Sequence, residues 1–191
     1  MKVKYMIVGA TFRVSNYDDG NSCQYWQPPK LEYMNSKTSK LITGVGSRLW
    51  KGSTECGRCL ELEDKVKVII GDYCPPPCTP MQLDLNQYSS SLLNPKEFKP
   101  KNYKVLRARK ILCEWGREEE IYLDKGSSVY NWYMIPLYVK KPFKSLKVLG
   151  QEAYHDLYGR WVIGFKKVYP QLNMTYMVQV DDMKFIKLIF P

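Results

Sequence analysis

Apolar residues alternate with polar ones, or form short continuous runs, along most of this chain, and glycine, proline and serine interrupt them. Such segments are typical of β-strands. We expect strands at residues 3–14, 59–73, 103–115, 120–126, 132–141, 145–150, 159–168, 175–182 and 183–190. Residues 85–98 favour instead one short helix that stops near Pro95. The chain is therefore predicted to be mostly β.

The cysteines suggest where the chain divides. All of them lie in the first 113 residues, and the remainder is rich in aromatic residues. A charged stretch, Glu114–Glu120, separates the two parts and reads as a solvated strand or linker. A boundary near residue 117 gives two parts of ordinary domain size, residues 1–117 and 118–191.

Net charge narrows the possible partners. A formal charge of +10 on 191 residues favours anionic partners such as acidic wall polymers. Lysine and arginine are spread along the chain without a nucleic-acid-binding motif, so nucleic acid is not the expected partner. No segment approaches the ~20 apolar residues of a membrane span. The first twelve residues have too short an apolar run for a secretory signal and read as a first strand, so either a signal has been removed or the protein never had one.

The cysteine spacing leaves three readings open. The six cysteines are Cys23, Cys56, Cys59, Cys74, Cys78 and Cys113. An even number is typical of disulfides in extracellular proteins. The pairs Cys56-x2-Cys59 and Cys74-x3-Cys78 also approximate the ligand spacing of a four-thiolate zinc site. A redox pair is disfavoured, because no helix follows Cys59 to lower a thiol pKa.

Several motifs, in order along the chain, resemble the expansins and expansin-like proteins. They are GATF (9–12), GSRLWKGSTECGRCLEL (46–62), VKVIIGDYCPPPC with MQLDLNQYSSSLL (66–93), RKILCEW (109–115) and LDKGSSVYNWYMIPLYVKKPFKSLKV (123–148). The resemblance implies a six-stranded double-psi β-barrel at residues 1–117, followed by a small immunoglobulin-like β-sandwich of carbohydrate-binding type at 118–191. It also implies disulfides Cys23–Cys56 and Cys59–Cys113, which leaves Cys74 to pair with Cys78.

Two aspartates are the candidates for chemistry. Asp84 lies between Leu83 and Leu85, at a strand end that enters the predicted helix. A half-buried carboxyl group there can donate a proton to a glycosidic oxygen. The resemblance implies this groove role for Asp84, with Asp72 and Thr11 as supporting polar groups and Tyr73 beside them. The alternative is structural: Asp72 caps a turn, and Asp84 is the N-cap of a helix that begins at Leu85.

Hydrolysis needs more than one acid. An inverting enzyme requires a second carboxylate to activate water. The nearest carboxylates after Thr11 are Asp18 and Asp19, which read as part of an exposed turn. The sequence therefore favours a protein without appreciable hydrolytic activity, as the resemblance to expansins also implies.

Aromatic residues supply the candidate sugar platform. Tyr130 and Trp132 are two positions apart on a predicted strand, so they are expected on one face. The resemblance implies a strip of aromatic rings there, and Trp50 is a further candidate in the barrel. The alternative is that one or both of the pair belong to the core. The lone histidine, His155, is expected at the surface.

The function expected from the sequence is secretion, followed by binding and loosening of a cell-wall polysaccharide such as cellulose, hemicellulose or peptidoglycan. No cofactor or metal is expected. Two alternatives stay open. One is a lytic glycosidase or transglycosylase that uses Asp84 as general acid. The other is a structural protein that reuses the fold with protein partners, for example in a virus particle.

Overall fold

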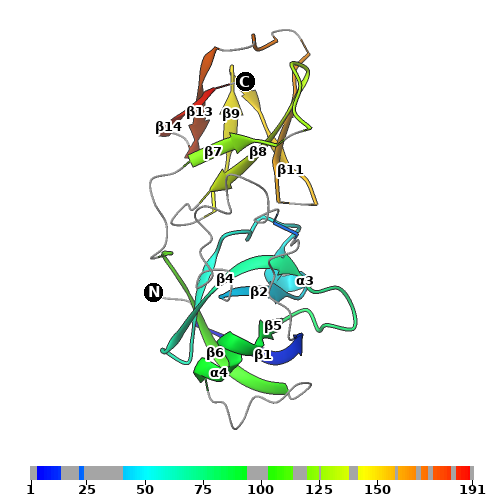
Figure 1. Ribbon diagram of the computed structural model, residues 1–191, viewed down its shortest axis with the longest axis vertical. Helices are drawn as coiled ribbons and strands as arrows, with labels where there is room; N and C mark the ends of the chain where they lie inside the picture. The colour runs from blue at the N-terminus through cyan, green and yellow to red at the C-terminus, as the bar shows by residue number, and fades with distance from the viewer. Residues whose placement is uncertain are drawn as a thin grey trace.

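The computed structural model describes residues 4–13, 22–23, 41–93, 103–113, 120–124, 126–137, 142–157, 159–166, 169–171, 174–181 and 184–189. Strands make up nearly all of the regular structure and the helices are short, which confirms the prediction of a mostly β chain. Figure 1 shows the earlier strands at one end of the molecule and the later strands at the other. Within the described residues, no helix has the length and apolar character needed to cross a membrane.

The earlier strands form a closed barrel in the order β1-β5-β2-β4-β3-β6. The pairs β1–β5 and β2–β4 are parallel, and the other paired neighbours are antiparallel. The strands are β1 (Lys4–Arg13), β2 (Ile42–Val45), β3 (Cys59–Leu62), β4 (Val66–Tyr73), β5 (Gln82–Asn86) and β6 (Tyr103–Ile111). Two short helices accompany them, α3 (Ser47–Trp50) and α4 (Gln87–Leu93).

The barrel core comes from one side of those strands whose side chains the structure describes. Alternating residues of β3 and β4 enter it, and so do Leu83 and Leu85 of β5. Because successive side chains of a strand point to opposite faces, Asp84 between these two leucines belongs to the outer face. In these strands, the apolar residues that alternate in the sequence are therefore the ones that fill the barrel.

The later strands form two four-stranded sheets, in the orders β10-β9-β13-β14 and β11-β12-β8-β7. One shared core of buried residues draws on both sheets, with Trp132 and Trp161 from one and Val148 and Val178 from the other. We call this part the two-sheet half. Its strands are β7 (Glu120–Leu123), β8 (Asn131–Leu137), β9 (Leu146–Val148), β10 (Gln151–Glu152), β11 (Tyr154–His155), β12 (Trp161–Gly164), β13 (Thr175–Val180) and β14 (Lys184–Ile189).

All six cysteines are paired in disulfides, Cys23–Cys56, Cys59–Cys113 and Cys74–Cys78. This is the pairing that the resemblance to expansins implied. The four-thiolate zinc alternative is wrong, because each of its sulfur atoms is bonded to another sulfur. Nor do the described residues contain any cluster of three or more metal-binding side chains.

Helix α4 begins where the sequence predicted a short helix, but a different residue caps it. The helix spans Gln87–Leu93, and the backbone N–H of Ser89 donates to Oδ1 of Asn86 at 2.9 Å. Asn86 is therefore the N-cap, and the expectation that Asp84 caps this helix is wrong. The predicted boundary near residue 117 lies outside the described residues.

Candidate functional site

Two carboxylates lie on the outer face of the barrel in one row across three strands. Asp84 of β5 pairs with Gly44 of β2, and Gly44 pairs with Asp72 of β4. Neighbouring strands are spaced ~4.8 Å apart, so the Cα atoms of the two aspartates are about 10 Å apart. Gly44 places no side chain between them. We call Asp84, Gly44 and Asp72 the carboxylate row.

A β-bulge puts Asp72 on the same face as Asp84. Val68 and Ile70 of β4 point into the core, and simple alternation would place Asp72 there as well. The pairing of β2 with β4 shifts between Thr43 and Gly44, so that Gly71 is an extra residue on β4. Beyond this bulge the alternation is inverted, and Tyr73 packs against the core instead. Asp72 consequently turns outward.

Asp84 is held firmly in its place on the row. Its side chain belongs to a residue only 8% exposed. Its backbone carbonyl accepts a hydrogen bond of 2.8 Å from the buried hydroxyl of Thr43 on β2. The strand pairing with Gly44 on one side and Ala10 of β1 on the other fixes the backbone further. These contacts fix the backbone from which the carboxyl group of Asp84 projects, and a carboxyl group on a fixed backbone is suited to orienting one hydroxyl or ring oxygen of a ligand.

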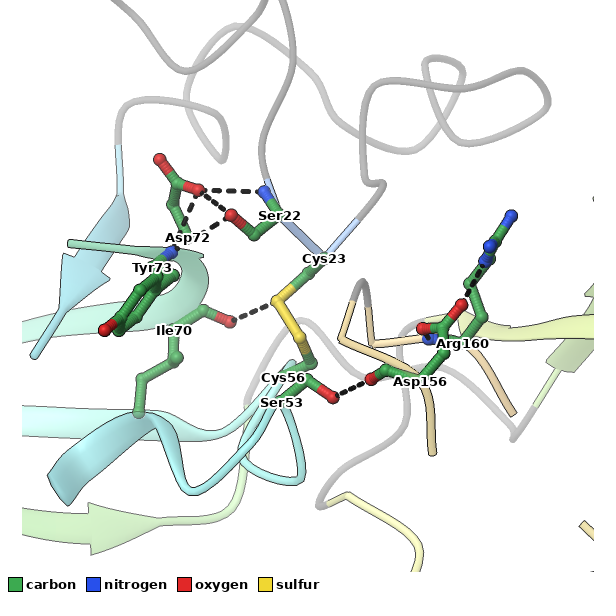
Figure 2. Close-up of a disulfide and its surroundings, with 9 residues drawn as sticks. All are labelled: Ser22, Cys23, Ser53, Cys56, Ile70, Asp72, Tyr73, Asp156 and Arg160. Atoms are coloured by element: carbon green, nitrogen blue, oxygen red, sulfur yellow. Dashed lines mark hydrogen bonds and ion pairs between the residues drawn. A yellow bond between two sulfur atoms is a disulfide. The ribbon is translucent and has the colours of Figure 1, made fainter. Parts of the chain in front are cut away.

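Asp72 anchors a distant segment of the chain, as Figure 2 shows. Its Oδ1 accepts hydrogen bonds from the N–H of Ser22 at 2.8 Å, from the hydroxyl of Ser22 at 2.5 Å and from the N–H of Tyr73 at 2.9 Å. Three donors use the full accepting capacity of this oxygen. The turn-capping role expected as an alternative is thus part of what Asp72 does, through Tyr73. Its other two hydrogen bonds hold Ser22 against the barrel.

The other residues predicted for the groove are placed less favourably. Thr11 of β1 pairs with Leu85, one position beyond the pairing of Ala10 with Asp84. Tyr73 is partly buried and its ring lies 5.7 Å from that of Trp50. Trp50 itself is only 5% exposed, so the expectation that its ring contacts sugar is wrong. Asp18 and Asp19 lie outside the described residues.

The predicted pair of sugar-binding rings, Tyr130 and Trp132, does not share a face. Trp132 has no exposed surface and packs edge-on against Phe165 and Tyr176 in the core of the two-sheet half. A ring without an exposed face cannot stack on a sugar, so this prediction for Trp132 is wrong. Tyr130 is 59% exposed and contacts the ring of Tyr169 edge-on. Tyr130 precedes β8, and strand alternation therefore does not apply to it.

A second group of tyrosines lies on the sheet face that points away from the core, and its member Tyr133 is one that the sequence motifs do not single out. Tyr154 of β11 and Tyr133 of β8 both pair with Val162 of β12, which sets the three side chains in one row. Tyr154 is 62% exposed, and the guanidinium of Arg160 lies 4.6 Å above the ring of Tyr133. We call Tyr133 and Tyr154 the tyrosine face. The alternation Trp132-Tyr133-Met134 could have revealed it, had Trp132 been assigned to the core.

His155 is not the surface residue expected from the sequence. Its ring centroid lies 4.0 Å from that of Trp161, with the two planes tilted by 49°, and both ring nitrogens are buried without a hydrogen-bond partner. Burial disfavours the charged imidazolium and lowers the pKa of His155 to about 4, although the nearby charge of Asp156 opposes this shift. His155 is therefore neutral at ordinary pH.

Several ion pairs lie on the barrel surface, at strands β3 and β6 and in the loop that precedes β3. Glu55 is nearly buried, and its carboxylate contacts Lys110 at 2.6 Å and Arg58 at 2.9 Å. Burial alone would raise the pKa of Glu55, but the hydrogen bonds and charges of these two cations outweigh it and the pKa is lowered. Arg109 likewise pairs with Glu61. These groups are engaged with one another and are structural.

Comparison with solved structures matches the fold over nearly all of the chain. An expansin of Clavibacter michiganensis, solved without ligand, superimposes with a TM-score of 0.70 over 97% of this chain and 90% of that chain, at 16% sequence identity. The fold is expansin-like. A mutant of the same bacterial expansin, solved in complex with cellohexaose, gives the same TM-score, identity and coverage. No family model matches the sequence, and no curated protein does.

Proposed function

We propose that this protein is an expansin-like protein that binds and loosens a cell-wall polysaccharide without appreciable hydrolysis. The observation that supports the proposal best is the carboxylate row on the outer face of the barrel, in a fold shared with an expansin that binds cellohexaose. We further propose that the barrel is of the double-psi type and that the two-sheet half is an immunoglobulin-like carbohydrate-binding domain. The boundary between the two domains is then near residue 117.

In this proposal each group has a stated task. Asp84 receives a hydrogen bond from a sugar hydroxyl, or donates one when protonated, while Gly44 leaves room for the ring beside it. Tyr154 and Tyr130 offer ring faces to the apolar C–H faces of sugars, and Tyr133 lies in the row of Tyr154 with the guanidinium of Arg160 over its ring. Covering ~50 Å² of tyrosine surface with a sugar ring contributes about 1.3 kcal/mol, or about tenfold in affinity. Thr11 stays a proposed neighbour of Asp84.

The hydrogen bonds of Asp72 favour a structural role over that of a catalytic base. An inverting glycosidase needs a second carboxylate that activates water. The Oδ1 of Asp72 already accepts three hydrogen bonds within the protein, which commits this carboxylate to holding Ser22 and the turn at Tyr73. Secretion is consistent with the three disulfides, which persist in oxidising compartments. Direct loosening by insertion between polymer chains fits these groups better than bond cleavage.

Binding and loosening can be tested separately. Binding is measured by titration calorimetry with cellohexaose and by pulldown on insoluble cellulose, xylan and peptidoglycan. Loosening is measured as creep of heat-inactivated wall strips under load. We expect Tyr154→Ala to lower binding about tenfold, whereas Asp84→Asn abolishes creep and leaves pulldown within about twofold.

The matched control is Asp64→Asn, which changes an exposed carboxylate in the turn between β3 and β4, far from the row along the strands. It should leave both measurements unchanged. Release of reducing ends from any of the polymers, abolished by Asp84→Asn, would favour the lytic alternative. Absence of binding to all of them would refute the proposal.

A further inference from the structure

The turn between β11 and β12 rests directly on the Cys23–Cys56 disulfide of the barrel (Figure 2). Gly159 lies in this turn with a φ of +75°. A Cβ added at Gly159 would lie 2.5 Å from Sγ of Cys56 and 3.4 Å from Cα of Cys23. Real Cβ atoms do not approach other atoms to 2.5 Å, so only glycine fits against the disulfide.

A hydrogen bond fixes the same turn from a second direction. The hydroxyl of Ser53, a fully buried residue of the barrel, donates to the backbone carbonyl of Asp156 at 2.5 Å. The turn itself is stiff, because the carboxylate of Asp156 accepts from the N–H of Arg160 at 3.0 Å and from its Nε at 2.7 Å. Arg160 also pairs with Asp124 at 2.9 Å and lies over Tyr133. Arg160 therefore connects Gly159, the residue before it, to Tyr133 of the tyrosine face.

On the barrel side, the disulfide leads directly to the carboxylate row. The N–H of Cys23 donates to the carbonyl of Gly71 at 3.0 Å, at the bulge that turns Asp72 outward. The preceding residue, Ser22, donates twice to Asp72. An unbroken set of contacts thus runs from the tyrosine face through Gly159 and the disulfide to Asp72.

We propose that Gly159 is a positioning residue that sets the tyrosine face relative to the carboxylate row, so that one polysaccharide chain contacts both. This inference rests on the proposed function. Two weak subsites held at a fixed spacing act on a long ligand as one strong site, because the second contact is intramolecular. A ligand too short to reach both gains nothing from the fixed spacing.

The chain supplies a matched control for this proposal. Gly150, in the turn between β9 and β10, has a φ of +74°, and an added Cβ there meets nothing within 4 Å. Gly159→Ala and Gly150→Ala therefore impose the same backbone strain within the two-sheet half, of about 1 kcal/mol. Only Gly159→Ala also places a methyl group against the disulfide, so only this variant disturbs the contact between the two halves.

The test measures affinities for cellohexaose and cellotriose by titration calorimetry, and the radius of gyration by small-angle X-ray scattering. We expect Gly159→Ala to weaken cellohexaose binding at least tenfold, to leave cellotriose binding within about twofold, and to enlarge the radius of gyration. Gly150→Ala should change none of these. Ser53→Ala, which removes the hydrogen bond without adding a clash, serves if Gly159→Ala does not fold, and should weaken cellohexaose selectively by a smaller factor.

The outcomes distinguish the two proposals. Equal weakening of both oligosaccharides, or no weakening of cellohexaose, would overturn the role of Gly159 while the proposed function stands. If the unaltered protein binds neither sugar, the proposed function fails, and so does the polysaccharide part of this inference. An unchanged radius of gyration in Gly159→Ala would overturn the positioning role itself.

Discussion

Removal of the Cys23–Cys56 disulfide should destabilise the protein far more than removal of Cys74–Cys78. The first bridge joins residues 33 positions apart and the second joins residues 4 apart. In the chain-entropy model, the bridge removes 2.1 + 1.5R ln n cal/mol/K from the unfolded chain, where n is the separation. At 25 °C this gives about 3.7 kcal/mol for Cys23–Cys56 and about 1.9 kcal/mol for Cys74–Cys78. The expected difference is about 2 kcal/mol.

The assay compares two double variants, Cys23→Ala with Cys56→Ala and Cys74→Ala with Cys78→Ala. Unfolding in urea is followed by far-UV circular dichroism and tryptophan fluorescence without reductant, and the free energies are extrapolated to water. Cys23 is buried and packs in the barrel core, so its truncation adds to the loss. Equal losses for the two variants, or a larger loss for the Cys74–Cys78 pair, would refute the reasoning.

Three further perturbations have definite signs. Burial lowers the pKa of His155 in the folded state from 6.5 to about 4, so its contribution to the free energy of unfolding is complete above pH 6.5. As the pH drops to 4, that free energy should fall by up to about 3 kcal/mol. His155→Phe should flatten this part of the pH profile of urea unfolding, and an unchanged slope would contradict the prediction. Trp132→Ala should cost about 3–5 kcal/mol in thermal unfolding, since the ring is fully buried, whereas Tyr130→Ala should cost under about 0.5 kcal/mol. Glu55→Gln should cost about 1–3 kcal/mol in urea unfolding at pH 7, because it removes the negative charge that Lys110 and Arg58 both contact. The cost should shrink as the pH falls through the lowered pKa of Glu55, and a variant as stable as the parent would show that these ion pairs add no net stability.

Much of the architecture could be predicted from local pattern. Alternation of apolar residues located strands such as β4 and β13, and the turn after Asn86 was recognisable as the start of a helix. The ordered motifs, taken together, implied the disulfide pairing that the structure has. These features depend on residues near one another in the chain or on a motif order that survives at low identity.

The errors came from the same alternation, which gives a period of two but does not say which face is buried. The alternation predicts Tyr130 and Trp132 on one exposed face, whereas Trp132 is buried in the core and Tyr133 lies on the opposite face of the sheet. The fold alone decides this, because a face becomes the core only when a second sheet covers it.

The sequence by itself determined that the chain is mostly β, that a short helix follows the strand at residues 82–86, and that Asp84 lies in that strand. Tertiary structure alone decided that Asp72 joins the same face, because the extra residue at Gly71 exists only relative to the register of β2. It also decided that Ser22 and Gly159, which no motif distinguishes, meet at one disulfide. Such contacts join segments far apart in the chain, and their energies depend on three-dimensional proximity that no local pattern records.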